Sequence, residues 1–342
     1  MNVQALVETT RKLMDGGRGL LAMDESPATC NKRFLAAGIP QTEAARRAYR
    51  ALMVTTPALN ASISGAILHD ETIRQKTTGG IPFVNILRDA DILAGIKVDT
   101  GARALALHPG ETITEGLDGL RGRLADYFGL GARFAKWRAV FTVTEAAPSR
   151  GCIAANAHAL ARYAALCQEA GIVPIVEPEV LMDGAHTRET CGKVTEDVLR
   201  CVFENLHSQS VCLEGMILKP NMVLPGSACP EQATDDEVAD ATLMHLRRAV
   251  PAAIAGIAFL SGGQPAERAT ARLNAMNARF RGPGARLPWP LSFSFARALQ
   301  HPALEIWRGE DANVALAQRA LLHRAACNRA ALRGEYSQSM EA

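Results

Sequence analysis

Eight short runs of apolar residues recur along the chain and are separated by longer segments with a helical pattern. The runs cover residues 18–24, 64–69, 92–99, 134–143, 172–179, 213–220, 255–263 and 290–296. Several are apolar in succession, which is typical of parallel strands that are covered on both faces. We therefore predict eight buried strands.

The segments between these runs carry helix signals. The clearest is 152–170, whose apolar positions advance by four, three, four and three residues, through Ile153, Ala157, Leu160, Ala164 and Cys167. Gly171 supplies a C-cap, and Thr234 followed by Glu237 predicts a capping box at the start of a later helix. The chain thus reads as repeated strand–helix units.

Eight such units favour an α/β fold, a single (β/α)8 TIM barrel, over an open doubly wound sheet. No G-x-G-x-x-G motif follows the first strand, which argues against a dinucleotide-binding sheet. The length of 342 residues also allows two average domains. We expect one barrel domain over 1–342, with an N-terminal helix and a short C-terminal tail at about 330–342.

The composition limits which binding partners and which cellular compartment we expect. A formal net charge of +2 is too small to indicate nucleic acid or an anionic membrane surface, and no apolar run approaches the roughly 20 residues that span a bilayer. The eight cysteines include no C-x-x-C pair, and the eight histidines show no zinc spacing. We expect a cytoplasmic protein with reduced thiols, no metal and no cofactor.

Polar residues gather where the predicted strands end, and in a parallel barrel these ends form one active-site mouth. They are Asp24, Glu25, Ser26, Lys97, Lys136, Arg138, Glu177, Glu179, Lys219, Ser261 and Arg297, and Gly262 and Gly263 accompany Ser261. Taken alone, Lys219 fits a surface lysine, and the "VEPE" segment fits a solvated strand end. Because barrel strands are covered on both faces, however, charge on them either points into the mouth or is badly desolvated.

Such a mouth suits carbonyl chemistry. A lysine among other cations and apolar walls has its neutral amine favoured, which makes it a nucleophile near neutral pH. Glu177 and Glu179 lie at i and i+2 on one face, so we expect their mutual repulsion to raise the pKa of one of them for acid–base duty. A lysine with a tuned carboxylate indicates a Schiff-base lyase.

Other residues indicate that anions are held. The "SGG" segment offers a hydroxyl and unhindered backbone amides, and Arg297 completes the phosphate site that barrels often build after strands seven and eight. A second cationic group is available from Arg33, Arg46, Lys97 and Arg138. Two anion sites around one carbonyl suit a sugar with a phosphate at each end.

Seven motifs, in order, resemble those of the class I (Schiff-base) fructose-1,6-bisphosphate aldolases. They are "LLAMDES", "GIKVDTG", "FAKWR", "VPIVEPE", "LKPNM", "FLSGGQ" and "LSFSFARALQ", and the resemblance runs from about the first helix to residue 337. The resemblance implies a metal-independent lyase of glycolysis that cleaves fructose 1,6-bisphosphate, folded as a TIM barrel and assembled as a homotetramer.

The resemblance also implies a role for each residue. Lys219 would form the Schiff base, Glu177 would be the principal acid and base, Glu179 would support the lysine, Asp24 would assist carbon–carbon cleavage, and Lys136 would lie beside the Schiff base. Ser261, Gly262, Gly263 and Arg297 would hold the phosphate next to the ketone. The far phosphate would fall to Ser26, Thr29, Arg33, Lys97 and Arg138, with Arg46 a further substrate contact.

The sequence departs from the family pattern in two places, a mild substitution and a shortened C-terminus that bears on the preference for a bisphosphate over a monophosphate substrate. The segment after "DES" reads "PATC" where the family commonly has "TGS", so Thr29 replaces a serine. The chain stops at "GEYSQSMEA", whereas many members extend further to a functional terminal tyrosine, a role that Tyr336 does not inherit. Other Schiff-base sugar-phosphate lyases, and a non-catalytic scaffold that binds phosphorylated ligands, stay open as alternatives.

Overall fold

The computed structural model describes residues 2–14, 16–146, 148–280 and 286–341. Eight parallel strands close into a barrel in the order β1-β10-β9-β8-β7-β6-β3-β2. They are β1 (Gly19–Ala22), β2 (Ile63–Leu68), β3 (Leu93–Lys97), β6 (Phe134–Phe141), β7 (Val173–Val180), β8 (Ile217–Leu218), β9 (Ile257–Phe259) and β10 (Leu291–Phe295). Each of the eight predicted strands is present, and the predicted (β/α)8 barrel is confirmed.

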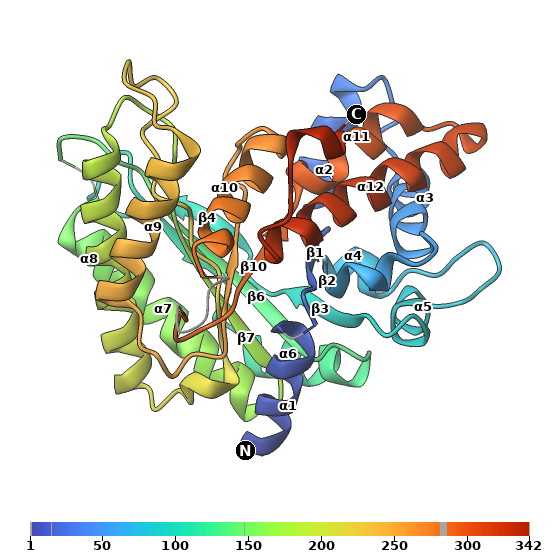
Figure 1. Cartoon of the computed structure of the whole chain (residues 1–342). Coiled ribbons are helices and arrows are strands. Elements are labelled where there is room, and N and C mark those ends of the chain that lie inside the picture. The colour runs from blue at the N-terminus through green and yellow to red at the C-terminus, as the bar shows by residue number, and fades with distance from the viewer. Residues whose placement is uncertain (1, 15, 147, 281–285, 342) are drawn as a thin grey trace.

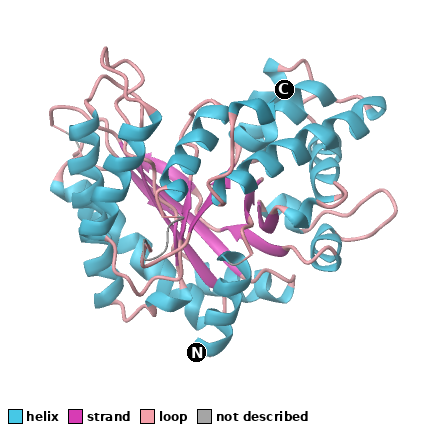
Figure 2. Ribbon diagram, viewed as in Figure 1, coloured by secondary structure: helices cyan, strands magenta, loops and turns pink. Residues whose placement is uncertain are grey.

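Helices surround the strands (Figures 1 and 2). The long ones are α3 (Glu43–Val54), α7 (Arg150–Glu169), α8 (Arg188–Ser208), α9 (Asp235–Ala249), α10 (Ala266–Ala278), α11 (Arg297–Trp307) and α12 (Val314–Leu332). Shorter ones are α2 (Pro27–Ala36), α4 (Asp70–Ile73), α5 (Phe83–Asp89) and α6 (Leu120–Gly129), and 3-10 turns occupy Leu59–Ala61, Leu213–Gly215, Asp311–Asn313 and Gln338–Glu341. None of the described helices has the length and hydrophobicity to cross a membrane.

The predicted helix signals can be compared with α7 and α9. Helix α7 begins two residues before the predicted start, because Ser149 accepts a hydrogen bond from the Cys152 N–H and caps it there. Gly171 follows α7 with φ +74°, a left-handed conformation that glycine adopts without a steric penalty. Thr234 and Glu237 form the predicted capping box on α9. These local predictions are therefore confirmed.

Two features differ from the sequence prediction. Only two residues of the predicted strand at 213–220 form β8, because a 3-10 turn occupies Leu213–Gly215. The apolar pattern does not reveal an antiparallel hairpin of β4 (Gly101–Ala104) and β5 (Thr112–Glu115). This hairpin lies between β3 and β6 in the sequence and forms a separate two-stranded sheet. It packs on the barrel where Thr114 Oγ1 donates to the Arg138 carbonyl at 2.8 Å.

One end of the barrel is filled by apolar side chains and closed by α1 (Val3–Met14). Leu6, Leu13 and Met14 of this helix join the buried cluster of inward-facing strand residues, which includes Phe134. In Figure 1, α1 lies at the lower end of the strands. A Cβ on Gly95 would approach Phe134 to 2.2 Å, so this glycine provides room for the ring. The other end of the barrel is left for the polar residues.

Candidate active site

Alternation along the strands decides which side chains reach the open end of the barrel. Successive residues of a strand point to opposite faces, so a residue two positions after an inward-facing one also faces inward. Ala22, Phe134, Ile175 and Ile217 belong to the inner cluster. Two positions later stand Asp24, Lys136, Glu177 and Lys219. Four strands thus deliver four charges to one place.

These four side chains form one chain of ion pairs. Lys136 Nζ lies 2.7 Å from Asp24 Oδ2 and 3.2 Å from Glu177 Oε2. The other oxygen of Glu177, Oε1, lies 3.0 Å from Lys219 Nζ. None of the four residues is more than 8% exposed. The candidate catalytic residues from β1, β6, β7 and the end of β8 are therefore brought together, with Glu177 between the two lysines.

Burial and charge act in opposite directions on this cluster. Burial alone would raise the pKa of Asp24, but Lys136 and Lys219 outweigh it and hold that pKa below its usual value. Burial would likewise raise the pKa of Glu177, and Lys136, Lys219 and Arg138 keep it low. Burial disfavours the charged form of Lys136, yet Asp24 and Glu177 raise its pKa. Ion pairing dominates desolvation, so the two carboxylates are ionised near neutral pH.

The raised pKa predicted for one of the two glutamates does not occur at Glu177. Repulsion from Glu179 was expected to raise the pKa of one glutamate, whereas the pKa of Glu177 is lowered. Glu179 instead accepts a hydrogen bond from Arg138 Nε at 2.5 Å. At Glu177 the nearby cations Lys136, Lys219 and Arg138 outweigh burial and set the direction of the shift. Among the described residues Glu179 pairs with Arg138, and no hydrogen bond or ion pair joins it directly to a lysine.

The residues expected near the ketone-side phosphate meet at the ends of β9 and β10. Ser261 is buried, and Gly262 and Gly263 follow it with φ values of +59° and +95°. A Cβ on Gly263 would lie 3.0 Å from Arg297 Nη2, which places the guanidinium of α11 beside this turn. A hydroxyl, a glycine turn and an arginine thus lie together, a combination suited to an anion.

The residues expected at the far phosphate stand in separate pairs. Ser26 is the N-cap of α2 and its Oγ lies 3.1 Å from Thr29 Oγ1, while Lys97 Nζ contacts Asp99 Oδ1 at 2.5 Å. Arg33 pairs with Glu25, and Arg46 donates to both carboxylate oxygens of Glu71. No interaction between described residues joins Arg46 to the four-charge cluster.

Sequence reasoning missed two groups near these residues. Arg50, 2% exposed, lies 2.8 Å from Glu25 Oε2 and fixes the residue next to Asp24. No periodic pattern shows such an arginine, because its partner is distant in sequence. The second is His69, at the end of β2. The predicted strand at 64–69 ends in this histidine, so its polarity was a signal that the sequence interpretation did not use.

One group of potential metal-ligating side chains occurs in the described part of the chain. It consists of His323, Cys327 and Glu341, whose ligand atoms lie within 4.8 Å of one another. Both oxygens of Glu341 already accept hydrogen bonds from Arg324. The group shares no residue with the barrel mouth and is not part of the candidate active site.

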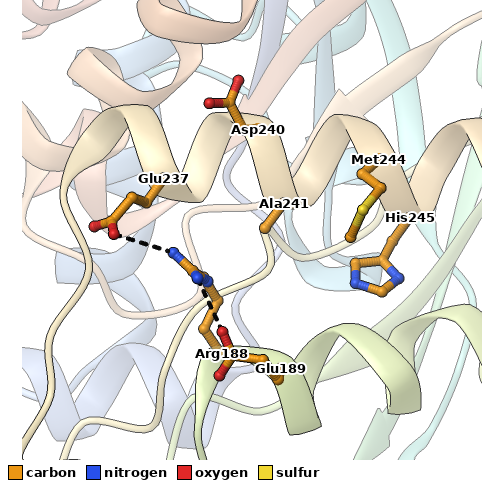
Figure 3. A pocket seen from close by; sticks show the side chains of 7 residues that line it. All are labelled: Arg188, Glu189, Glu237, Asp240, Ala241, Met244 and His245. Carbon is orange, nitrogen blue, oxygen red and sulfur yellow. Dashed lines mark hydrogen bonds and ion pairs between the residues drawn. The ribbon is translucent and has the colours of Figure 1, made fainter.

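A surface pocket between α8 and α9 also lies apart from the mouth. Charged residues that line it pair with each other, as Figure 3 shows. Arg188 Nη2 lies 2.9 Å from Glu189 Oε1, and Arg188 Nη1 lies 3.6 Å from Glu237 Oε1. Asp240, which lies on α9 with Glu237, pairs with Arg279. The pocket contributes no residue to the four-charge cluster.

The chain is a (β/α)8 barrel with paired lysines and carboxylates at its mouth, the place where barrel enzymes carry their active sites. The family model for class I fructose-bisphosphate aldolase matches residues 5–342. A probable class 1 fructose-bisphosphate aldolase of Xanthomonas campestris pv. campestris is 55% identical over 337 residues, or 98% of this chain and 99% of that protein. A fructose-bisphosphate aldolase of Dictyostelium discoideum is 48% identical over 335 residues, or 97% and 92%.

Solved structures agree with these relatives. A Plasmodium falciparum fructose-bisphosphate aldolase, crystallised with TRAP and a small-molecule inhibitor, superimposes with a TM-score of 0.95 at 46% identity and covers 98% of this chain and 95% of that one. The chain belongs to the class I fructose-bisphosphate aldolase family and is an enzyme of the lyase class.

Proposed function

We propose that the enzyme reversibly cleaves fructose 1,6-bisphosphate to dihydroxyacetone phosphate and glyceraldehyde 3-phosphate through a Schiff base on Lys219. The carrying observation is the contact of 3.0 Å between Lys219 Nζ and Glu177 Oε1, both buried at the barrel mouth. Family membership supports the substrate. The reaction serves glycolysis and gluconeogenesis.

The first half of the reaction forms the Schiff base. Glu177 enters as a carboxylate because its pKa is lowered, and its Oε1 lies 3.0 Å from Lys219 Nζ, within reach of the proton that the amine must lose. The neutral amine attacks the ketone carbon, and Glu177 then returns its proton to the carbinolamine hydroxyl, which leaves as water and gives an iminium ion. Lys136, paired with both Asp24 and Glu177, keeps positive charge beside this centre.

The second half breaks the carbon–carbon bond. Asp24 assists removal of the proton from the 4-hydroxyl, the bond between the third and fourth carbons breaks, and its electron pair moves into the iminium to give an enamine. Glyceraldehyde 3-phosphate leaves. Protonation of the enamine at the third carbon and hydrolysis of the new iminium release dihydroxyacetone phosphate and restore Lys219.

The binding residues divide between the two ends of the substrate. We assign the ketone-side phosphate to Ser261, Gly262, Gly263 and Arg297, which lie together in the fold. We assign the far phosphate to Ser26, Thr29, Arg33, Lys97 and Arg138, with Arg46 as a further substrate contact. Glu179 orients Arg138 through their hydrogen bond.

The assembly and the setting are proposed with the same function. We propose that residues 1–342 act as one barrel domain, that the chain forms homotetramers, and that the enzyme works in the cytoplasm without metal, nucleic acid or membrane. Activity that a chelator abolishes and zinc restores would contradict the metal-independent part.

Borohydride trapping tests the central step. The enzyme is incubated with dihydroxyacetone phosphate, reduced with borohydride and mapped by peptide mass spectrometry. We expect one adduct, on Lys219, and none in Lys219→Met or without the ketone. An adduct on Lys136 instead, or none on folded enzyme, would refute the assignment.

Turnover of fructose 1,6-bisphosphate well above that of fructose 1-phosphate separates the proposal from other Schiff-base lyases, and any turnover excludes a non-catalytic scaffold.

A further inference from the structure

The second barrel strand also presents a polar side chain to the mouth. Ile67 of β2 belongs to the inner cluster, so the alternation of the strand turns His69, two positions later, to the same side. His69 has φ −93° and ψ 161°, an extended conformation that carries the alternation through this residue. The imidazole is therefore at the level where the neighbouring strands place their charges.

The strand register shows which charges flank it. Ala22 of β1 pairs with Ile67, so the register carried on by two residues brings Asp24 opposite His69. On the other side Leu68 pairs with Ile96, which brings Lys97 opposite His69. The imidazole thus lies between a residue assigned to bond cleavage and a residue assigned to the far phosphate.

The tautomer of His69 follows from its own hydrogen bond. The Glu71 N–H donates to His69 Nδ1 at 3.3 Å, so Nδ1 is unprotonated and the neutral ring carries its proton on Nε2. Nε2 has no hydrogen-bond partner among the residues that the structure describes. Burial, then Lys97 and Arg50, lower the pKa of His69 against the opposing effect of Asp24 and Asp70, which favours this neutral ring near neutral pH.

We propose that His69 is a substrate-binding residue that donates its Nε2–H to an oxygen of the glyceraldehyde 3-phosphate half. The inference rests on the proposed function, because Asp24 and Lys97 define that half of the site. It adds a contact from β2, the strand to which neither the motifs nor the charge pattern assigned a residue.

Two substitutions separate this role from capping of α4. His69→Asn keeps an acceptor that suits the N-cap position but has no donor where Nε2 stands. His69→Gln places an amide N–H near the position of Nε2 and is a poor cap. A binding role predicts damage in His69→Asn and recovery in His69→Gln, whereas a purely structural role predicts the reverse.

The condensation direction gives the readout, since the two product halves are then separate substrates. For His69→Asn we expect the KM for glyceraldehyde 3-phosphate to rise about tenfold, the effect of one lost hydrogen bond, and the KM for dihydroxyacetone phosphate to stay within about twofold. His69→Gln should recover most of the loss. Equal effects on both KM values, or normal kinetics in His69→Asn, would overturn the inference.

Two further measurements guard the interpretation. Borohydride trapping of dihydroxyacetone phosphate on Lys219 should be unchanged in both variants; failure of trapping in the unsubstituted enzyme would refute the proposed function itself. In the unsubstituted enzyme, glyceraldehyde 3-phosphate should slow carbethoxylation of His69 by diethyl pyrocarbonate, and dihydroxyacetone phosphate should not. Equal modification rates with and without the aldehyde would contradict the contact even if a variant failed to fold.

Discussion

The two ends of the barrel use the same inward positions of the same strands for opposite purposes. At the lower end Phe134 and Ile175 pack with Leu6 and Leu13 of α1. Two residues further along these strands, at the mouth, stand Lys136 and Glu177. The side chains are buried at both ends. A single two-residue step along the strands therefore separates the apolar cluster that contains Leu6, Leu13, Phe134 and Ile175, here called the plug, from the ionic cluster at the mouth.

Burial has opposite energetic consequences at the two ends. Covering an apolar side chain contributes roughly 1.5–3 kcal/mol to stability. Burying a charge costs free energy unless a partner restores most of it, and breaking a buried pair leaves that cost uncompensated. At the mouth the order Asp24, Lys136, Glu177, Lys219 alternates in sign, so each charge has an opposite neighbour. The plug stabilises the barrel, while the mouth keeps reactive groups in place.

The largest effect is expected at the mouth. Lys219→Met should lower kcat by a factor on the order of 10⁴ or more, because it removes the nucleophile. Steady-state cleavage assays check this, with circular dichroism to show that the variant is folded. Lys12→Met, an exposed lysine on α1, is the matched control and should retain full activity. Activity within about tenfold of normal in Lys219→Met would contradict the distinction between the two ends.

The charge on Lys136 is expected to stabilise the mouth in a pH-dependent way. The pKa values of Asp24 and Glu177 are lowered on folding, so the stability that they contribute is present above their unfolded pKa values of about 4 and lost as the pH falls through the folded values. Lys136→Met removes a main cause of both shifts. At pH 7 it should cost about 3–5 kcal/mol in the free energy of unfolding.

The pH profile sharpens that prediction. The difference between Lys136→Met and the unsubstituted enzyme should shrink as the pH falls toward about 4, where protonation removes the charges that lack a partner. Guanidinium unfolding at several pH values measures it. A loss of stability that is the same at pH 4 and pH 7 would show that packing, and not charge, is what Lys136 contributes.

The plug should respond in stability alone. Leu13→Ala removes a fully buried side chain and should lower the free energy of unfolding by about 3 kcal/mol, through lost burial and a residual cavity. The kcat should be unchanged at temperatures where the variant is folded. Leu316→Ala, at a side chain 48% exposed on α12, should cost little. A large fall in kcat for folded Leu13→Ala would show that the plug and the mouth are coupled.

The barrel could be predicted from the sequence because its strands are continuous apolar runs. The prediction at 134–143 begins at the same residue as β6, and that at 64–69 lies within one residue of β2 at each end. The hairpin of β4 and β5 escaped prediction because its strands are short and nearly all of their residues are at least partly exposed, so no burial pattern marks them. The plug formed by α1 also depends on tertiary packing that periodicity does not show.

The members of the candidate site were predictable, but their pairing was not. Strand ends and motifs identified Glu177 and Lys219 as candidates, and the fold brings them to 3.0 Å. The raised pKa predicted for one of the two glutamates is not found at Glu177, because the sequence shows Glu179 two residues away but not the cations that neighbouring strands deliver. Which charge meets which depends on the stagger of strands in the closed barrel.

The smallest effect is expected in the helices around the barrel, where the loss of one helix cap gives a reference for the stability changes at the two ends. Thr234→Ala removes the hydroxyl that accepts from the Glu237 N–H at the start of α9, and should cost about 1 kcal/mol in the free energy of unfolding with no change in kcat. Thr234→Ser keeps the hydroxyl and should stay close to normal. Equilibrium unfolding and cleavage assays on both variants check this. If Thr234→Ala lowered the free energy of unfolding as much as Leu13→Ala does, the apolar end would not contribute more to stability than the helices around the barrel.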